Sequence, residues 1–245
     1  VKPISIQEIA EKADIVFLSL PALHHVEAVC TGKEGLLAHA RSLKTIVDMS
    51  TSDVERTRQL AALLQKSGLE LIDAPVARSR EAANNGTLLI TVGATEAQFS
   101  AVKPYLDCMG SDVLHCGPTG GGQVVKIMNN MVLLNTVHTL AEAFAIAEKT
   151  GVSKDLLAEA LGLGSAASFA LKLNGANYLA KDVFPEKMFS TAYALKDLKL
   201  ALELSNTVQL SNQITELTAE KLQRAVDAGF ADNYYPVMYR IIANT

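Results

Sequence analysis

One lysine inside an apolar stretch is the side chain of this sequence best suited to move a proton. Lys126 lies in GGGQVVKIMNN, with Gly122 four residues before it and Asn130 four residues after it. Residues spaced by four share one face of a helix. Apolar neighbours desolvate an ammonium group, which lowers its pKa and makes it usable as a general acid or base. A lysine that merely extends from a buried helix towards solvent has the same spacing, so the pattern alone leaves both interpretations open.

Residues close to Lys126 on its helix, and others that follow a predicted strand, suit a bound substrate. Gly122 would leave space for the close approach of a flat ring, and Asn130 offers both a donor and an acceptor. DAPV at residues 73–76 ends a predicted strand, where open parallel sheets bind ligands. Ala77, Arg78 and Ser79 follow, and arginine binds carboxylates, sulfonates and phosphates through its fork. A solvated loop is the alternative interpretation.

Two other stretches carry polar or charged side chains. DMSTSD at residues 48–53 ends another predicted strand and offers the hydroxyls of Ser50, Thr51 and Ser52. These could hydrogen-bond a cofactor or only cap the helix that follows. ALKDLKLA at residues 194–201 places Lys196 and Asp197 in a predicted helix, which by itself could be a charged, solvated face.

The pattern of elements predicts a two-domain chain. Five short apolar runs, at residues 14–20, 45–50, 69–76, 87–93 and 112–117, read as strands, and amphipathic segments such as 52–68 and 95–110 lie between them. Alternating strands and helices predict an α/β domain with a mainly parallel, Rossmann-like sheet over residues 1–118. Helical periodicity alone follows, beginning with a long helix up to Gly151, so residues 119–245 are predicted to form an all-helical substrate and oligomerisation domain.

The composition excludes several classes of protein. The 245 residues carry a net charge of −4 and no run of lysines or arginines, which argues against a nucleic-acid partner. Cys30, Cys108 and Cys116 form no CxxC pair, so we expect free thiols in a cytoplasmic protein and no metal. No apolar run reaches membrane length, so no membrane partner is expected. The apolar surface of the long helix predicts a homodimer or homotetramer.

Taken in order, these stretches resemble the β-hydroxyacid dehydrogenase family. That family includes 3-hydroxyisobutyrate dehydrogenase and tartronate semialdehyde reductase, and 6-phosphogluconate dehydrogenase is a more distant relative. The resemblance covers nearly the whole chain and rests on five motifs: LP at Leu20–Pro21, the DMST turn, DAPV followed by GTL at residues 86–88, the Gly120, Gly122, Lys126, Asn130 pattern, and KDLKLA.

The resemblance implies NAD or NADP as cofactor and assigns roles to individual residues. Lys126 corresponds to the catalytic lysine that exchanges a proton with the substrate oxygen, and Asn130 to the residue that orients the substrate. Lys196 corresponds to a lysine that reaches the cofactor, held by Asp197. The remaining contacts implied are Leu20, Pro21, Ser50, Thr51 and Ser52 for the cofactor, and Ala77, Arg78, Ser79 and Gly122, with Lys126 and Asn130, for the substrate.

The sequence departs from the family at two places. The family's GxGxxG unit, with its acidic residue, would precede Val1. We therefore expect an N-terminally incomplete α/β domain that binds dinucleotide poorly by itself. The choice between NAD and NADP stays open, because the residue that discriminates them would lie in that unit. The family's DAPVSGG is DAPVARS here, which is similar to sulfolactaldehyde reductases and predicts a sulfonated substrate.

The function predicted from these residues is hydride transfer between a nicotinamide cofactor and a small anionic hydroxy acid or its semialdehyde, with Lys126 as general acid and base. A non-catalytic binding or oligomerisation protein that keeps the fold is the main alternative. An enzyme that forms an imine on Lys126 is another, but it leaves Lys196 and the DMST turn unexplained.

Overall fold

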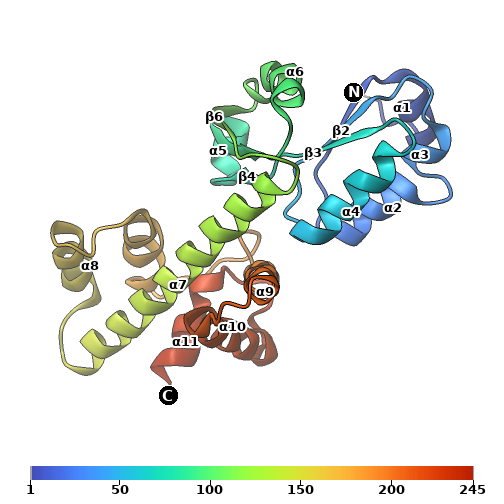
Figure 1. The fold of residues 1–245 in the computed structure, drawn as a ribbon. Coiled ribbons are helices and arrows are strands. Elements are labelled where there is room, and N and C mark those ends of the chain that lie inside the picture. Colours follow the sequence, from blue (N-terminus) through green and yellow to red (C-terminus); the bar gives the residue numbers. More distant parts are fainter. Residues whose placement is uncertain (1, 245) are drawn as a thin grey trace. The chain divides into compact units, whose positions relative to one another are not determined.

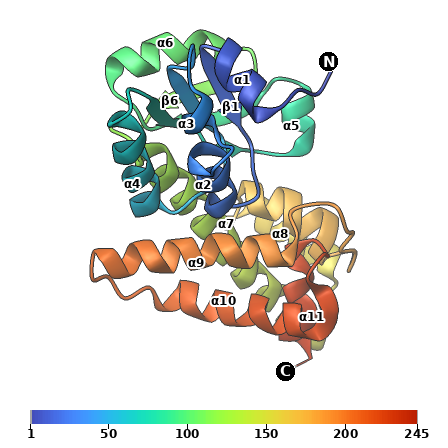
Figure 2. The same ribbon diagram turned by 90° about the vertical axis from the view of Figure 1, so that its right-hand side faces the viewer.

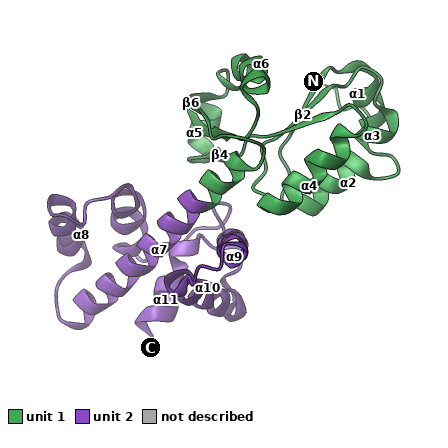
Figure 3. Cartoon of the chain, in the orientation of Figure 1, with its two compact units in different colours: residues 1–127 green, residues 128–245 purple. Residues whose placement is uncertain are grey.

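The computed structural model describes residues 2–244, which fold into two compact units that divide after Ile127 (Figure 3). The units join inside helix α7 (Gly121–Lys149), between Ile127 and Met128. The predicted division into functional domains at residues 118 and 119 falls just before this helix and stays a prediction.

The first unit contains the predicted parallel sheet. Strands β1 (Ile15–Leu18), β2 (Thr45–Asp48) and β3 (Glu70–Asp73) lie side by side in that order, all parallel (Figure 1). The register pairs Leu18 with Asp48 and Asp48 with Asp73. The carboxyl ends of the three strands therefore meet at one edge, and two of them end on an aspartate.

The segment at residues 69–76, predicted as one strand followed by a turn, is divided. After β3 the chain continues as β4 (Val76–Ala77), which pairs antiparallel with β5 (Leu88–Val92), and β5 pairs parallel with β6 (Gly110–His115). Pro75 has no N–H, and its carbonyl accepts from Thr91 N–H at 3.1 Å. At DAP the chain leaves the parallel sheet of β1, β2 and β3 and enters a second three-stranded sheet of β4, β5 and β6. The mainly parallel character of the predicted α/β domain is confirmed.

Alternating side chains of the strands enter two separate cores. Ile46 and Leu71 pack with helices α1 (Ile6–Lys12), α2 (Leu23–Thr31), α3 (Leu36–His39) and α4 (Val54–Gln65). Val47 and Ile72, one residue further along each strand, pack instead with α5 (Arg80–Asn84) and α6 (Glu96–Leu106). A strand alternates its side chains between the two faces, so each face of the sheet has its own layer of helices.

The named elements of the second unit are all helices. They are the rest of α7, α8 (Lys154–Leu163), the π-helix η1 (Leu171–Leu179), α9 (Thr191–Thr207), α10 (Gln213–Ala225), the π-turn η2 (Val226–Phe230), the 3₁₀ turn η3 (Tyr235–Val237) and α11 (Met238–Ala243). Helices α9 and α10 run side by side (Figure 2). Leu134, Val137, Ala141 and Phe144 face the core at helical spacing, as the sequence predicts. Between residues 2 and 244, no helix combines the length and apolar composition needed to cross a bilayer.

Gly122, in the first turn of α7, allows the helix to touch the sheet. A Cβ atom at this position would lie 2.3 Å from the carbonyl oxygen of Thr91 in β5 and 2.9 Å from Oδ2 of Asp73. The space beside Gly122 is therefore filled by strand backbone, and the expectation that it is open to a ligand's ring is wrong on this side. The glycine is explained by close packing of helix against sheet.

We expect Gly122→Ala to destabilise the protein by about 1–3 kcal/mol, because a strand carbonyl cannot move away as a side-chain tip can. The free energy of unfolding in urea would measure the change. Gly162→Ala is the matched control, since Gly162 lies in helix α8 and a methyl group added there would meet no atom within 4 Å. That substitution should stabilise by up to about 1 kcal/mol. Equal stability of Gly122→Ala and the wild type would contradict the packing role.

Candidate active site

The amino terminus of α7 is held by a buried carboxylate from the sheet. Gly120 N–H donates to Asp73 Oδ1 at 2.6 Å, and Gln123 N–H donates to Asp73 Oδ2 at 2.9 Å. The first N–H groups of a helix have no partner within the helix, and its N-terminus carries partial positive charge. Asp73 is fully buried and supplies both the partners and the opposite charge. It thereby fixes the start of the helix that carries Lys126.

The side chain of Gln123 joins this helix to the predicted cofactor turn. Its Oε1 accepts from Ser52 N–H at 2.9 Å, and its Nε2 donates to the Ser50 carbonyl oxygen at 2.8 Å. Gln123 is fully buried, and Ser50 and Ser52 are nearly so. The turn is therefore attached to α7 by one amide group through two hydrogen bonds.

A second buried carboxylate, that of Asp48, accepts hydrogen bonds from the same turn. Asp48 accepts from Ser50 N–H at 2.9 Å and from the Ser52 hydroxyl at 3.3 Å. The Ser50 hydroxyl in turn accepts from Leu20 N–H at 2.9 Å, which ties in the loop after β1. Burial raises the pKa of Asp73 to about 6 and also raises the pKa of Asp48, although their hydrogen bonds act in the opposite direction.

These residues fit the nicotinamide half of a dinucleotide. Leu20 and Thr51 are half-buried and Pro21 is exposed, at the carboxyl ends of β1 and β2. Small hydroxyl side chains and backbone groups at this edge suit the neutral, polar ribose and carboxamide, which need donors and acceptors but no countercharge. Lys126 is half-buried on α7, three residues after Gln123.

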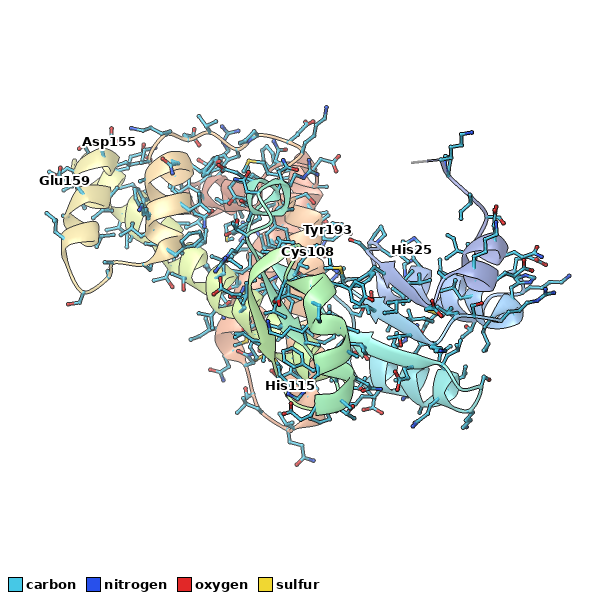
Figure 4. All side chains as sticks on the ribbon, turned by 90° about the horizontal axis from the view of Figure 1, so that it is seen from above. His25, Cys108, His115, Asp155, Glu159 and Tyr193 are labelled. Atoms are coloured by element: carbon cyan, nitrogen blue, oxygen red, sulfur yellow. The ribbon has the colours of Figure 1, made fainter. Side chains whose placement is uncertain are left out.

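In the second unit, Asp197 connects two of the predicted site residues. Its Oδ2 accepts from Asn130 Nδ2 at 2.6 Å, and its Oδ1 lies 3.1 Å from Lys196 Nζ, as an ion pair without hydrogen-bond geometry. The ring of Tyr193, labelled in Figure 4, lies beneath the Lys196 ammonium at 4.9 Å from its centroid. Asn129 Nδ2 donates to Asn130 Oδ1 at 3.1 Å, so both ends of the Asn130 amide are oriented.

The predicted substrate loop is placed differently from the expectation. Ala77 is buried in β4, and the Ser79 hydroxyl caps α5 by accepting from Ala82 N–H at 3.2 Å. Arg78 has φ +85°, a left-handed conformation that favours glycine. Its guanidinium donates to the Thr87 carbonyl, the Ser111 hydroxyl and the Asp112 carboxylate at 2.6, 2.8 and 2.6 Å. The side chain that was expected to bind an anion therefore already has three acceptors within the first unit.

Other groups that could carry chemistry do not assemble into a metal site. His115 stacks on Phe99 and bonds Glu96 and the Ala94 carbonyl, whereas His25 lies on α2 (Figure 4). Within residues 2–244, no three histidine, cysteine or acidic side chains come close enough to hold a metal ion.

Sequence reasoning overlooked the residues that hold the site together. Asp48, Asp73, Gln123 and Asn129 were not predicted, yet each hydrogen-bonds a predicted residue or its turn. One signal was present: two predicted parallel strands both end on aspartate, and their ends must meet at one edge of the sheet. No pattern in the sequence indicated that the Gln123 side chain would hydrogen-bond the Ser50–Ser52 turn.

Two family models match this chain. Residues 3–117 match the family model described as the NAD binding domain of 6-phosphogluconate dehydrogenase. Residues 120–242 match the model described as NAD-binding of NADP-dependent 3-hydroxyisobutyrate dehydrogenase. The second match alone covers half of the chain. This chain belongs to the β-hydroxyacid dehydrogenase family.

Individual members of the β-hydroxyacid dehydrogenase family resemble it over most of its length. The 2-(hydroxymethyl)glutarate dehydrogenase of Eubacterium barkeri is 34% identical over 92% of this chain and 75% of its own length. The 3-hydroxyisobutyrate dehydrogenase of Pseudomonas aeruginosa is 36% identical over 84% of this chain and 71% of its own length. The solved structure of Mycobacterium tuberculosis 3-hydroxyisobutyrate dehydrogenase with L-serine superposes with a TM-score of 0.87, at 30% identity over 96% of this chain and 81% of that one. Membership confirms an NAD- or NADP-dependent hydroxyacid dehydrogenase.

We expect Asp197→Asn to raise the KM for cofactor and lower kcat/KM by about tenfold to a hundredfold, because it removes the partner charge of Lys196 and disturbs the Asn130 amide. Steady-state kinetics at varied cofactor concentration would measure both constants. The control is Asp155→Asn in the same unit, where an exposed ion pair with Lys181 is lost and little change is expected. Equal kinetics of the two variants would show that Asp197 holds nothing of functional importance.

Proposed function

We propose that this protein oxidises a small anionic hydroxy acid, or reduces the corresponding semialdehyde, with Lys126 as general acid and base. Family membership supports the oxidoreductase class. The observation that carries the residue assignment is the anchoring of α7. Asp73 and Gln123 fix the first turn of the helix against the cofactor turn, and Lys126 follows one turn later.

The proposed reaction assigns the hydride transfer to the cofactor and the proton transfer to the protein. When bound, the nicotinamide accepts the hydride from the carbinol carbon in oxidation and supplies it in reduction. Lys126, as the neutral amine, takes the proton from the substrate hydroxyl in oxidation. As the ammonium, it returns that proton to the carbonyl oxygen in reduction. Electrons and protons then balance with no further reactant.

The other residues position the reacting atoms. Asn130 is held by Asn129 and Asp197, so its amide would meet a substrate oxygen in a fixed orientation. Lys196, paired with Asp197 and placed over Tyr193, would bind the cofactor with its ammonium. Holding groups before the substrate arrives lowers the entropic cost of the productive geometry.

The substrate class is proposed from the relatives and from the loop after β4. The relatives named above are named for 2-(hydroxymethyl)glutarate and 3-hydroxyisobutyrate, both hydroxy acids. A carboxylate substrate therefore has the broader support. A sulfonated aldehyde is the narrower prediction and depends on Arg78, which would have to exchange Asp112 for the sulfonate.

We expect Lys126→Met to lower kcat by about 10²- to 10⁴-fold while the Kd for cofactor stays near that of the wild type, since only the proton transfer is removed. Stopped-flow measurement of NADH or NADPH formation with full encoded protein would test it. Lys149→Met, at the exposed end of the same helix, is the control. A Lys126→Met variant with wild-type kcat would remove the proposed mechanism. Wild-type protein that turns over no hydroxy acid with either cofactor would favour the non-catalytic alternative.

The sulfonate prediction is tested by two variants with opposite expected effects. If Arg78 binds the sulfonate, Arg78→Gly should lower kcat/KM for a sulfonated aldehyde about tenfold relative to a carboxylated one. Asp112→Asn, which loosens the competing ion pair, should raise that ratio a few fold. If neither substitution changes the ratio, Arg78 only anchors the loop, and the sulfonate prediction is wrong.

A further inference from the structure

Gln123 is fully buried and takes no part in the proton or hydride transfer of the proposed mechanism. Its backbone N–H binds Asp73, while its side chain binds both ends of the Ser50–Ser52 turn. We propose that Gln123 is a positioning residue, which sets the cofactor turn at a fixed distance from the helix that carries Lys126. This inference rests on the nicotinamide cofactor of the proposed function but not on its substrate.

The chemistry of a primary amide matches what the turn presents. The turn offers one donor, Ser52 N–H, and one acceptor, the Ser50 carbonyl, and the amide answers them with Oε1 and Nε2 at 2.9 and 2.8 Å. A methionine side chain fills the same volume but leaves both backbone groups buried without partners. A glutamate carboxylate could accept from Ser52 but could not donate to Ser50. Glutamine therefore pairs with both backbone groups of the turn, whereas methionine and ionised glutamate do not.

The position of this amide connects two parts of the proposed reaction. On one side, the same turn is fixed by Asp48 and bonds the loop after β1 through Leu20, so Gln123 acts on both predicted cofactor loops. On the other side, the residue lies three positions before Lys126 in an uninterrupted helix. A shift of the Gln123 side chain would displace the cofactor turn relative to Lys126, and reactions of this kind are sensitive to displacements of about 1 Å.

Gln123→Met should raise the Kd for NADH or NADPH about tenfold, because two buried hydrogen bonds to the turn are lost. Fluorescence titration of the full encoded protein measures this without turnover. Thr91→Val is the matched control, since the Thr91 hydroxyl donates to the Gly122 carbonyl at 3.0 Å, in the same turn of α7 but away from the cofactor turn. It should lower the melting temperature by a similar amount and leave the Kd within about twofold. Equal shifts of Kd in the two variants would overturn the proposal.

Gln123→Glu gives a pH signature that a merely structural role would not produce. A protonated carboxyl has one O–H donor and one carbonyl acceptor, as the amide does, whereas the ionised form has acceptors only. Asp73 on β3 accepts from the backbone N–H of residue 123, and Asp48 on β2 accepts from the turn that its side chain binds. Arg58 on α4 donates to the Thr119 carbonyl just before α7, and Lys126 follows three residues later on α7 itself. They are present in the wild type too, so the ratio of variant to wild-type Kd isolates residue 123. The ratio should be near one at about pH 5 and rise about tenfold by about pH 8, since burial raises the pKa of the new carboxyl. A ratio independent of pH would count against the proposal.

Amide hydrogen exchange of the wild type tests the contact without any substitution. Ser52 N–H should exchange as slowly as Gln123 N–H, because releasing the turn requires opening the same network. Exchange of Ser52 at the rate of an exposed amide would overturn the proposal even if no Gln123 variant folds. Retained turnover in Lys126→Met would refute the proposed acid–base role and would leave these binding and exchange results unaffected.

Discussion

The structure around the site depends on one buried carboxylate placed at the start of one helix. Asp73 ends β3 and accepts the N–H groups of Gly120 and Gln123. Hydrogen bonds to a charged acceptor are stronger than neutral ones, and the helix N-terminus favours negative charge. Without this contact, the first turn of α7 would lose the two hydrogen bonds that hold it to β3. The direction in which that helix leaves the sheet decides where Lys126 lies.

The space for this carboxylate comes from glycines on both sides of the contact. A Cβ atom at Gly93 would lie 2.3 Å from Asp73 Oδ1, and one at Gly122 would lie 2.9 Å from Oδ2. Burial raises the pKa of Asp73 to about 6, while the helix hydrogen bonds favour the ionised form. Desolvation is thus only partly compensated. A buried carboxylate needs hydrogen bonds such as those from Gly120 and Gln123 to favour its charged form.

The loop after β4 keeps an arginine in a backbone conformation that this residue type rarely adopts. Arg78 adopts the left-handed conformation that favours glycine, with φ +85°. The cost of that conformation, on the order of 1 kcal/mol, is opposed by three hydrogen bonds to Thr87, Ser111 and Asp112. Hydrogen bonds from Ser111 and then from Arg78 lower the pKa of Asp112, which keeps the ion pair charged. The arginine therefore ties the loop to β6, a role that its residue type did not reveal.

The sequence by itself determined the classes of element, because their signals are local. Strand runs such as residues 45–50 and the helical spacing of Leu134, Val137 and Ala141 depend only on the period at which apolar side chains recur. The shared face of Lys126 and Asn130 follows from the same local rule. Motifs in register along the chain were enough to indicate the family, although substrate and cofactor choice depend on side chains that periodicity does not describe.

Only the tertiary structure decided which distant groups satisfy one another. Gln123 reaches Ser50 and Ser52 across more than seventy positions of sequence, and Asp197 reaches Asn130 across sixty-seven. Gly122 faces a strand carbonyl, since the first turn of α7 packs against β5 at that point. Buried polar groups must find partners wherever the fold brings them, and the identity of those partners is set by packing between elements rather than by the pattern within any one of them.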